Sequence, residues 1–125
     1  MTVNAGATAQ VELLVTDSDT AIALRSGDVA VLATPRVLQI CEEATIKALG
    51  AQLGPGRTSV GLRVEITHIA PNVVGSRVTA TATLERCEGK RLLFNVSVSD
   101  ESGLVAAGRV TRVVVDPVAF LDNAR

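Results

Sequence analysis

The chain has 125 residues, of which 47% are hydrophobic, and a formal net charge of -1 at pH 7. This length predicts one domain, residues 1–125, whose core buries roughly two-thirds of the unfolded surface without help from disulfides. A nearly neutral chain with two aromatic residues offers neither the basic surface nor the stacking rings that nucleic acids need. We therefore expect no nucleic-acid partner.

No segment of the sequence is typical of export or membrane insertion. The N-terminus lacks a basic stretch followed by an apolar run, and no uninterrupted apolar stretch reaches ~18 residues. We expect a cytoplasmic protein with no membrane partner. Cys41 and Cys87 are far apart, with neither a CxxC spacing nor a neighbouring histidine. This predicts two reduced core thiols and no metal site.

The first predicted elements are a short strand and one long helix. Residues 10–16 form a β-prone run that ends in a cluster of polar residues. Thr34 can then cap a helix with its hydroxyl group, and Pro35 suits the first helical position because it has no amide hydrogen to leave unpaired. The helix is expected to continue to about Leu53, where the Gly-Pro-Gly sequence at residues 54–56 ends it.

Four further strand-like segments follow, at residues 57–70, 77–87, 91–99 and 104–115. The turns between them are hairpin-like, which predicts an antiparallel meander. Alternation of apolar and polar residues gives the sheet one apolar face, and the apolar stripe of the helix is broad enough to cover that face. The pattern predicts an α+β fold in which an antiparallel sheet curves around one long helix. The open edges of such a sheet favour a homodimer.

His68 is the only histidine in the chain, and it lies in the most strand-like segment. The residues ahead of it on the same side of the strand are apolar: Val60, Leu62, Val64 and Ile66. A lone strand histidine is most often a hydrogen-bonded core or edge residue. Its imidazole can nevertheless exchange protons near neutral pH, so a catalytic role stays open.

Glu42 and Arg112 also break apolar patterns. On the predicted helix, Leu38 and Ile46 lie four residues to either side of Glu42, which places its carboxylate at the border of the buried stripe. Glu42 either reaches past that border to solvent or acts as a partly buried acid or base. Arg112 shares its side of the last strand with apolar residues and could form a buried ion pair with Glu42.

Thr34 and Gly61 each have two interpretations. Thr34 is first of all a helix cap, but a hydroxyl at the positive end of the helix dipole also favours a nearby oxyanion or water. Gly61 removes a side chain from the middle of a strand, which usually marks a bulge or leaves room for a ligand or another backbone. Taken singly, these residues leave both interpretations open.

Taken together and in order, five features resemble a known enzyme family. They are ATPR at residues 33–36, EE at 42–43, PGRTSVG at 55–61, HIAP at 68–71 and a strand arginine at 112. Over residues 11–115, approximately, the chain is similar to hotdog-fold proteins of the fluoroacetyl-CoA thioesterase type. The resemblance implies a hotdog fold, a homodimer and acyl-CoA thioester sites near the subunit interface. It also implies that no cofactor is needed, because CoA is part of the substrate.

The resemblance assigns roles to individual residues. The catalytic threonine, acidic residue and histidine of the family correspond to Thr34, Glu42 and His68. Its glycine beside the thioester corresponds to Gly61 and its active-site arginine to Arg112, which are therefore expected to contact the substrate. The implied reaction is hydrolysis of an acyl-CoA thioester to a carboxylic acid and CoA. A non-catalytic acyl-CoA binding or sensing module, a structural dimer and a hotdog dehydratase are the alternatives.

The segment ahead of Thr34 bears on the acyl group of the substrate. The fluoroacetate-specific enzyme carries aromatic residues over its acyl pocket in that segment, whereas this chain has none between residues 21 and 31. We therefore expect a short or medium acyl-CoA as the substrate, in place of the fluorinated one.

Overall fold

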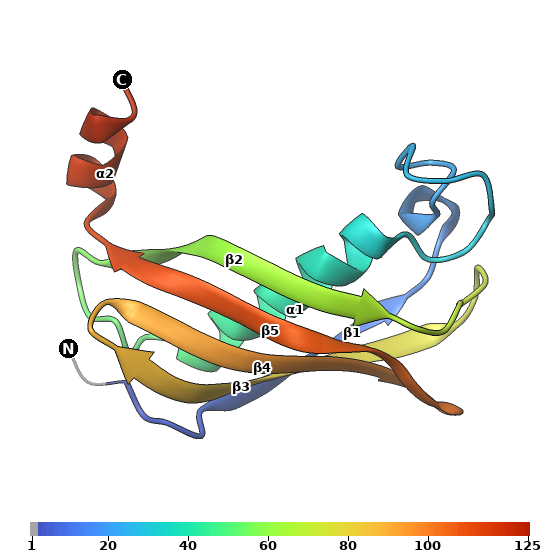
Figure 1. Ribbon diagram of the computed structural model, residues 1–125, viewed down its shortest axis with the longest axis horizontal. Coiled ribbons are helices and arrows are strands. Elements are labelled where there is room, and N and C mark those ends of the chain that lie inside the picture. The colour runs from blue at the N-terminus through green and yellow to red at the C-terminus, as the bar shows by residue number, and fades with distance from the viewer. Residues whose placement is uncertain (1–2) are drawn as a thin grey trace.

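In the computed structural model, which describes residues 3–125, a five-stranded antiparallel sheet curves around one long helix (Figure 1). The elements in chain order are β1 (Thr8–Leu14), the 3-10 helix η1 (Asp17–Asp19), α1 (Thr34–Leu49), β2 (Thr58–His68), β3 (Arg77–Glu88), β4 (Arg91–Asp100), β5 (Gly103–Val115) and α2 (Pro117–Asn123). The strand order in the sheet is β1-β3-β4-β5-β2. The predicted α+β class and the sheet curved around one helix are confirmed.

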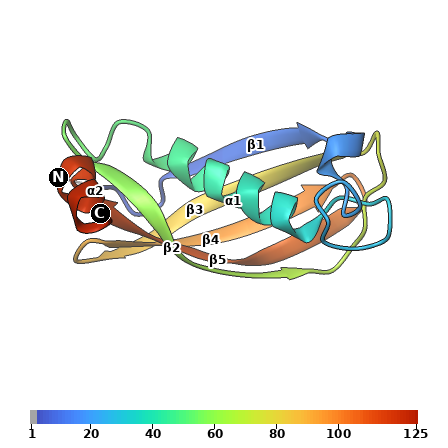
Figure 2. The same ribbon diagram turned by 90° about the horizontal axis from the view of Figure 1, so that it is seen from above.

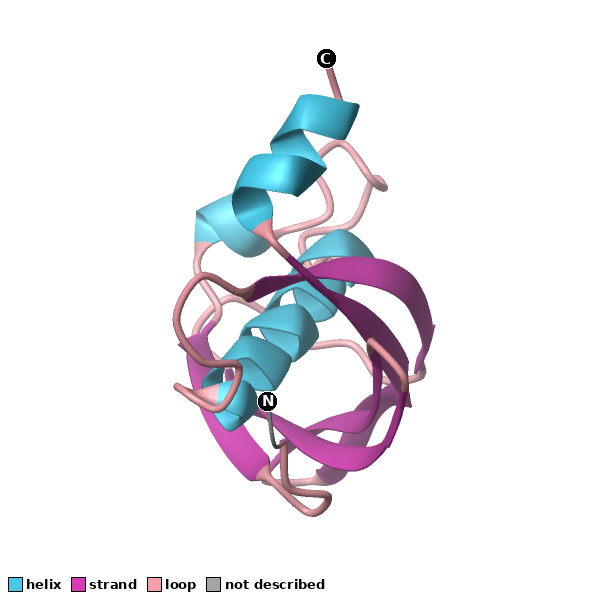
Figure 3. Ribbon diagram, turned by 90° about the vertical axis from the view of Figure 1, so that its left-hand side faces the viewer, coloured by secondary structure: helices cyan, strands magenta, loops and turns pink. Residues whose placement is uncertain are grey.

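The core lies between α1 and the concave side of the sheet, as Figures 2 and 3 show. Alternation along β3 and β4 turns one row of side chains toward the helix, and this row is fully or almost fully buried. The helix contributes a buried face of seven residues: Val37, Ile40, Cys41, Ala44, Thr45, Ala48 and Leu49. Two small residues in the middle of β3, Ala80 and Ala82, are completely buried and leave room for α1 to approach the sheet.

The predicted meander is correct for β3, β4 and β5 but wrong for β2. β2 pairs with β5 at one edge of the sheet, and β1 takes the place beside β3. The connection from β2 to β3 covers residues 69–76. Because this connection is longer than the two to five residues of a typical hairpin loop, it does not force the two strands to pair.

The long helix begins and ends differently from the prediction. Ala33 is the N-cap and Thr34 the first helical residue, so Pro35 occupies the second helical position and Thr34 makes no capping hydrogen bond. The helix ends four residues early, because Gly50 adopts a positive φ of 52° that side chains disfavour. Leu53 is still buried, since the chain folds back toward the core in a turn.

The short C-terminal helix α2 has no counterpart among the predicted elements. Its start nevertheless carries ordinary helix-start signals: a capping side chain followed by proline. The carboxylate of Asp116 accepts hydrogen bonds from the amides of Val118 and Ala119, and Pro117 is the first helical residue. Within residues 3–125, no helix is long and apolar enough to cross a membrane.

The two cysteines differ in exposure, so the prediction of two core thiols is wrong for Cys87. Cys41 is buried on α1, and burial, together with the nearby Glu42 carboxylate, raises the pKa of its thiol to about 12. Cys87 is exposed near the end of β3. The pairing of β3 with β4 shifts register between Leu84 and Arg86, and the β3 residues after that shift are all exposed.

Candidate active site

A β-bulge in β2 decides which of its side chains face α1. The register against β5 shifts between Gly61 and Arg63, so β2 holds one extra residue there. The alternation of sides reverses at such a bulge. His68 therefore lies on the opposite side of the sheet from Val60 and from Leu62, which is 51% exposed. The predicted apolar row ahead of His68 is wrong for these two members.

Thr34 and His68 meet where α1 begins and β2 ends. The Oγ1 atom of Thr34 lies 2.8 Å from the Nδ1 atom of His68, so the two side chains share a hydrogen bond. The Thr34 hydroxyl thus bonds to His68, whereas the N-cap position of the helix belongs to Ala33. The Nε2 atom of His68 is buried and has no hydrogen-bond partner in the described part of the chain. The imidazole therefore has one nitrogen bound to a hydroxyl and one available for proton transfer.

A pocket of about 280 Å³ lies beside the Thr34–His68 pair. Its wall comes from the segment before α1, from the first residue of α1 and from the chain that follows β2. Apart from Thr34, His68 and Ser26, the lining residues are aliphatic: Ala21, Val31, Leu32, Ile69, Ala70 and Pro71. The pair thus stands at the wall of a small, largely apolar pocket.

Glu42, Gly61 and Arg112 form a second group, farther along α1 and β2. Arg112 is 4% exposed, and its Nη1 atom donates to the Oε2 atom of Glu42 at 3.3 Å. Burial lowers the pKa of Arg112, and the neighbouring Glu42 carboxylate partly offsets that effect. A Cβ atom at Gly61 would stand 2.5 Å from the Oε2 atom of Glu42, so only glycine leaves space for the carboxylate against β2. The ion pair between Glu42 and Arg112 that the sequence suggested is therefore present.

Ser59 belongs to this second group but is absent from the predicted site residues. The Nε atom of Arg112 donates to the Oγ atom of Ser59 at 2.8 Å, and Nη2 donates to the main-chain oxygen of Ser59 at 3.0 Å. One feature of the sequence could have identified Ser59 as a site residue. It stands two residues before Gly61, inside the same motif and on the same side of the strand. Its contact with β5 depends on strand pairing, which local sequence does not reveal.

Within one chain, the two groups of predicted residues stay apart. Thr34 and Glu42 are eight residues apart in α1, about 12 Å along the helix axis. Gly61 and His68 are seven residues apart in β2, about 20 Å along the strand. The hydrogen bonds described above join Thr34 to His68 and Glu42 to Arg112, but none joins one group to the other.

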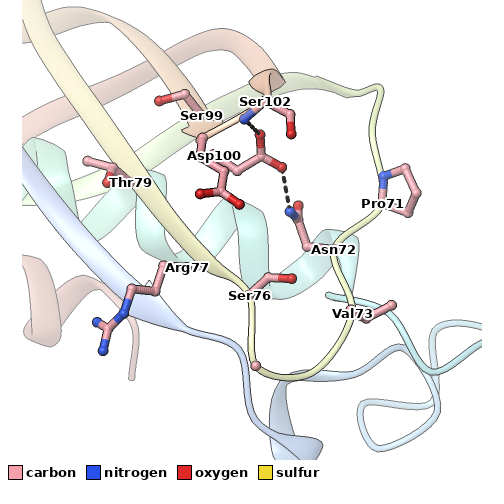
Figure 4. Close-up of a pocket in the computed structure, with 11 residues that line it drawn as sticks. Pro71, Asn72, Val73, Ser76, Arg77, Thr79, Ser99, Asp100 and Ser102 are labelled. Carbon is pink, nitrogen blue, oxygen red and sulfur yellow. Dashed lines mark hydrogen bonds between the residues drawn. The ribbon is translucent and has the colours of Figure 1, made fainter.

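A larger pocket, of about 770 Å³, lies next to the connection that follows β2 and contains none of the predicted site residues (Figure 4). Asn72 is 4% exposed there, and its Nδ2 atom donates to the Oδ2 atom of Asp100 at 2.8 Å. Its main-chain oxygen accepts a hydrogen bond from the amide of Leu32. Asn72 therefore connects the chain after His68 to the chain before Thr34 and to the β4–β5 turn.

Asn72→Ala is expected to lower the melting temperature by roughly 4 °C at pH 7, because it removes a hydrogen bond from a buried side chain. That hydrogen bond is the main cause that holds the pKa of Asp100 below its ordinary value. A lowered folded-state pKa stabilises the fold above the unfolded-state pKa of about 3.9, and the contribution is lost as the pH falls through the folded-state pKa. In thermal unfolding at several pH values, the difference from wild type should therefore shrink below about pH 4.

Ser102→Ala is the matched control for Asn72→Ala. Asp100 accepts from the main-chain amide of Ser102, which alanine retains. The control is expected to unfold like wild type at every pH. The role given to Asn72 would be contradicted if both variants lowered the melting temperature equally. It would also be contradicted if the decrease in Asn72→Ala did not depend on pH.

Comparison with solved structures assigns this arrangement of sheet and helix to the hotdog fold of thioesterases. A hot-dog-like protein from Thermanaerovibrio acidaminovorans aligns with 96% of this chain and 89% of its own chain, with a TM-score of 0.89 and 31% identity. A variant of the fluoroacetyl-CoA thioesterase, solved in complex with acetyl-CoA, aligns with 98% of this chain and 97% of its own, with a TM-score of 0.91 and 27% identity.

The chain belongs to the fluoroacetyl-CoA-specific thioesterase family, whose sequence pattern matches residues 15–118. The fluoroacetyl-CoA thioesterase of Streptantibioticus cattleyicolor is 35% identical over 95 residues, which cover 76% of this chain and 68% of that protein. The resemblance stated from the motifs is confirmed, and so is the predicted enzyme class, a thioester hydrolase.

Proposed function

We propose that the protein hydrolyses short or medium acyl-CoA thioesters to a carboxylic acid and CoA, at sites shared by the two subunits of a homodimer. Family membership supports the reaction class. The observation that carries the proposal within the molecule is the hydrogen bond between Thr34 and His68 at the wall of an apolar pocket. The pair combines a hydroxyl and a titratable imidazole where the acyl end of a thioester can enter.

The dimer would bring the two groups of site residues together. Within residues 3–125, β2 ends the sheet and pairs only with β5, so it presents a free edge to a second chain. Antiparallel pairing of two β2 strands about a two-fold axis places the start of one strand beside the end of the other. Glu42 and Gly61, near the start of β2, would then meet the Thr34–His68 pair of the partner subunit.

The charges on β2 support this pairing. Arg63 and Glu65 are both well exposed and lie on the same side of the strand, where their side chains form an ion pair at 2.8 Å. Pairing centred on Val64 would set Arg63 opposite Glu65 of the partner subunit, and Glu65 opposite the partner's Arg63. Opposite charges across antiparallel strands stabilise such a pairing, and the arrangement is complementary to itself.

In the proposed mechanism, His68 takes a proton from water or from Thr34 as the oxygen attacks the thioester carbonyl. The main-chain amide of Gly61 would donate to the carbonyl oxygen, on which negative charge develops. When the tetrahedral intermediate collapses, the carbon–sulfur bond breaks and His68 returns the proton to the CoA thiolate. Glu42 either orients the imidazole or the water, or attacks the carbonyl itself to form a transient anhydride. When Thr34 or Glu42 is the nucleophile, a water molecule then hydrolyses the acyl-threonine ester or the anhydride, which releases the carboxylic acid and restores the side chain. The ion pair of Glu42 with Arg112 favours the orienting role, because pairing lowers the nucleophilicity of a carboxylate.

The pocket supports the choice of substrate. Drug-sized ligands occupy pockets of roughly 300–1,000 Å³, so the 280 Å³ beside Thr34 suits an acyl end, with CoA outside it. Among residues 3–125, no aromatic side chain lines this pocket. A variant of the fluoroacetyl-CoA thioesterase was solved in complex with acetyl-CoA, a thioester with a short unsubstituted acyl group, which supports a similar substrate for this chain. We also propose that no cofactor takes part and that the dimer is cytoplasmic, where the exposed thiol of Cys87 would stay reduced.

A panel of acyl-CoAs from acetyl-CoA to dodecanoyl-CoA, with fluoroacetyl-CoA included, tests the proposal. Released CoA is followed with a thiol-reactive dye. We expect turnover with the highest kcat/KM for a short or medium acyl group and no preference for the fluorinated one. Saturable binding without CoA release would instead identify a sensing module, and no binding at all a structural dimer. Hydration of an enoyl-CoA without thioester cleavage would identify a dehydratase.

A further inference from the structure

We infer that Ser59 positions Arg112, and through it the Glu42 carboxylate, for thioester hydrolysis. The inference rests on the proposed function, because it concerns the Glu42 side of the same site. Ser59 makes no contact with Glu42 among its hydrogen bonds, so its effect is exerted through the guanidinium group. It is a positioning residue and takes no part in bond breaking.

Ser59 holds one whole edge of the Arg112 guanidinium. A guanidinium is planar and presents its donors in fixed directions. Its Nε and Nη2 atoms both donate to Ser59, the first to the hydroxyl at 2.8 Å and the second to the main-chain oxygen at 3.0 Å. With that edge fixed, Nη1 is directed at the Oε2 atom of Glu42, 3.3 Å away. Loss of the hydroxyl removes the shortest of these three hydrogen bonds.

The bulge in β2 explains why a serine at this position reaches the arginine. Gly61 stands opposite Arg112 in the register of β2 with β5, and Ser59 stands opposite Val114. Ser59 is therefore the diagonal neighbour of Arg112 on the same side of the sheet, within reach of a long side chain. Because Gly61 has no side chain, the guanidinium can pass over it to meet both Ser59 and Glu42.

Arg112 lies beside a pocket, so its side chain needs Ser59 to hold it in place. Ser59 and Arg112 line a pocket of about 180 Å³ near the end of α1, together with Arg57. An arginine side chain with several rotatable bonds can turn into such a space when its hydrogen bonds weaken. Burial also lowers the pKa of Arg112, so each acceptor that remains near its charge matters. Ser59 keeps the guanidinium on the Glu42 side of this pocket.

Ser59→Ala is expected to lower kcat for acyl-CoA hydrolysis about 10-fold while KM changes less than about threefold, because it misplaces a catalytic group without removing substrate contacts. Ser59→Thr keeps the hydroxyl and is expected to restore most of the activity. Ser99→Ala, an exposed serine on β4, is the matched control and should behave as wild type. A Ser59→Ala enzyme with wild-type kcat would overturn the inference.

A double-mutant cycle separates positioning from general damage to the fold. If Ser59 acts through Arg112, adding Ser59→Ala to Arg112→Ala is expected to change kcat less than twofold. A further 10-fold loss in that background would show that Ser59 acts independently. Should Ser59→Ala fail to fold, Ser59→Cys keeps a similar volume with a weak acceptor and is expected to lose activity as well. Wild-type kcat in Ser59→Cys would then overturn the inference.

The wild-type enzyme distinguishes a failure of this inference from a failure of the proposed function. If wild type releases no CoA from any acyl-CoA, the proposed function fails, and the role of Ser59 in it fails too. If the wild-type enzyme releases CoA and Ser59→Ala has the same kcat, the proposed function stands and the inference alone is wrong.

Discussion

His68→Ala is expected to reduce kcat/KM for acyl-CoA hydrolysis by a factor of about 10²–10⁴, because the variant lacks the group that moves the proton in both steps of the reaction. The Thr34 hydroxyl remains but loses its hydrogen-bond partner, 2.8 Å away in the native enzyme. Steady-state release of CoA from the best substrate of the acyl-CoA panel measures the loss. A variant with more than about a tenth of wild-type kcat/KM would exclude His68 as the proton-transfer group.

A mixed dimer provides the control for a site shared between subunits. Chains carrying His68→Ala and chains carrying Glu42→Ala are co-expressed with different affinity tags, and the heterodimer is purified. If each site takes His68 from one subunit and Glu42 from the other, one site of the heterodimer has both substitutions and the other has neither. We then expect about half of the wild-type activity. If the heterodimer has no activity above that of the single variants, each chain completes its own site, contrary to the proposed dimer.

The strands could be predicted because each one carries its own alternating pattern, but their neighbours in the sheet could not. β3, β4 and β5 are joined by tight turns that leave no alternative to pairing. β2 is joined to β3 by the longer connection at residues 69–76, and its place beside β5 depends on how all five strands pack together. That is a property of the whole sheet, whereas the pattern of residues 58–68 is local.

The site shows the same limit. Glu42 and Arg112 could be identified because each places a charge in an apolar pattern. Val110 and Val114 beside Arg112 are buried, as that pattern predicts, whereas Ile46, one turn after Glu42, is 54% exposed. The side of β2 on which Val60 and Leu62 lie could not be predicted, since the bulge exists only in the pairing with β5. Ser59 was missed for that reason, because nothing in its immediate sequence marks it as the partner of Arg112.

Gly61→Ala is expected to lower kcat by about 10² while the melting temperature changes little. The added Cβ would stand 2.5 Å from the Oε2 atom of Glu42 and 3.9 Å from the Nη1 atom of Arg112. The atom in the way is the end of a flexible side chain, so Glu42 can turn aside at small cost to the fold. Displacement by about an ångström is nevertheless enough to disable a catalytic group. Rates of CoA release and thermal unfolding of the same samples measure the two effects.

The Glu42→Ala background tests whether the added methyl acts through the carboxylate. Without the Glu42 side chain, the space beside residue 61 is open, and alanine in a strand is then neutral or slightly stabilising because it restricts the unfolded chain more than glycine does. We therefore expect Gly61→Ala to cause no further loss of kcat in that background. If the methyl lowers kcat equally in both backgrounds, it blocks the approach of the thioester to β2, and the loss would be a direct effect on substrate. If Gly61→Ala alone leaves kcat unchanged, Glu42 does not need its place against Gly61 for the reaction.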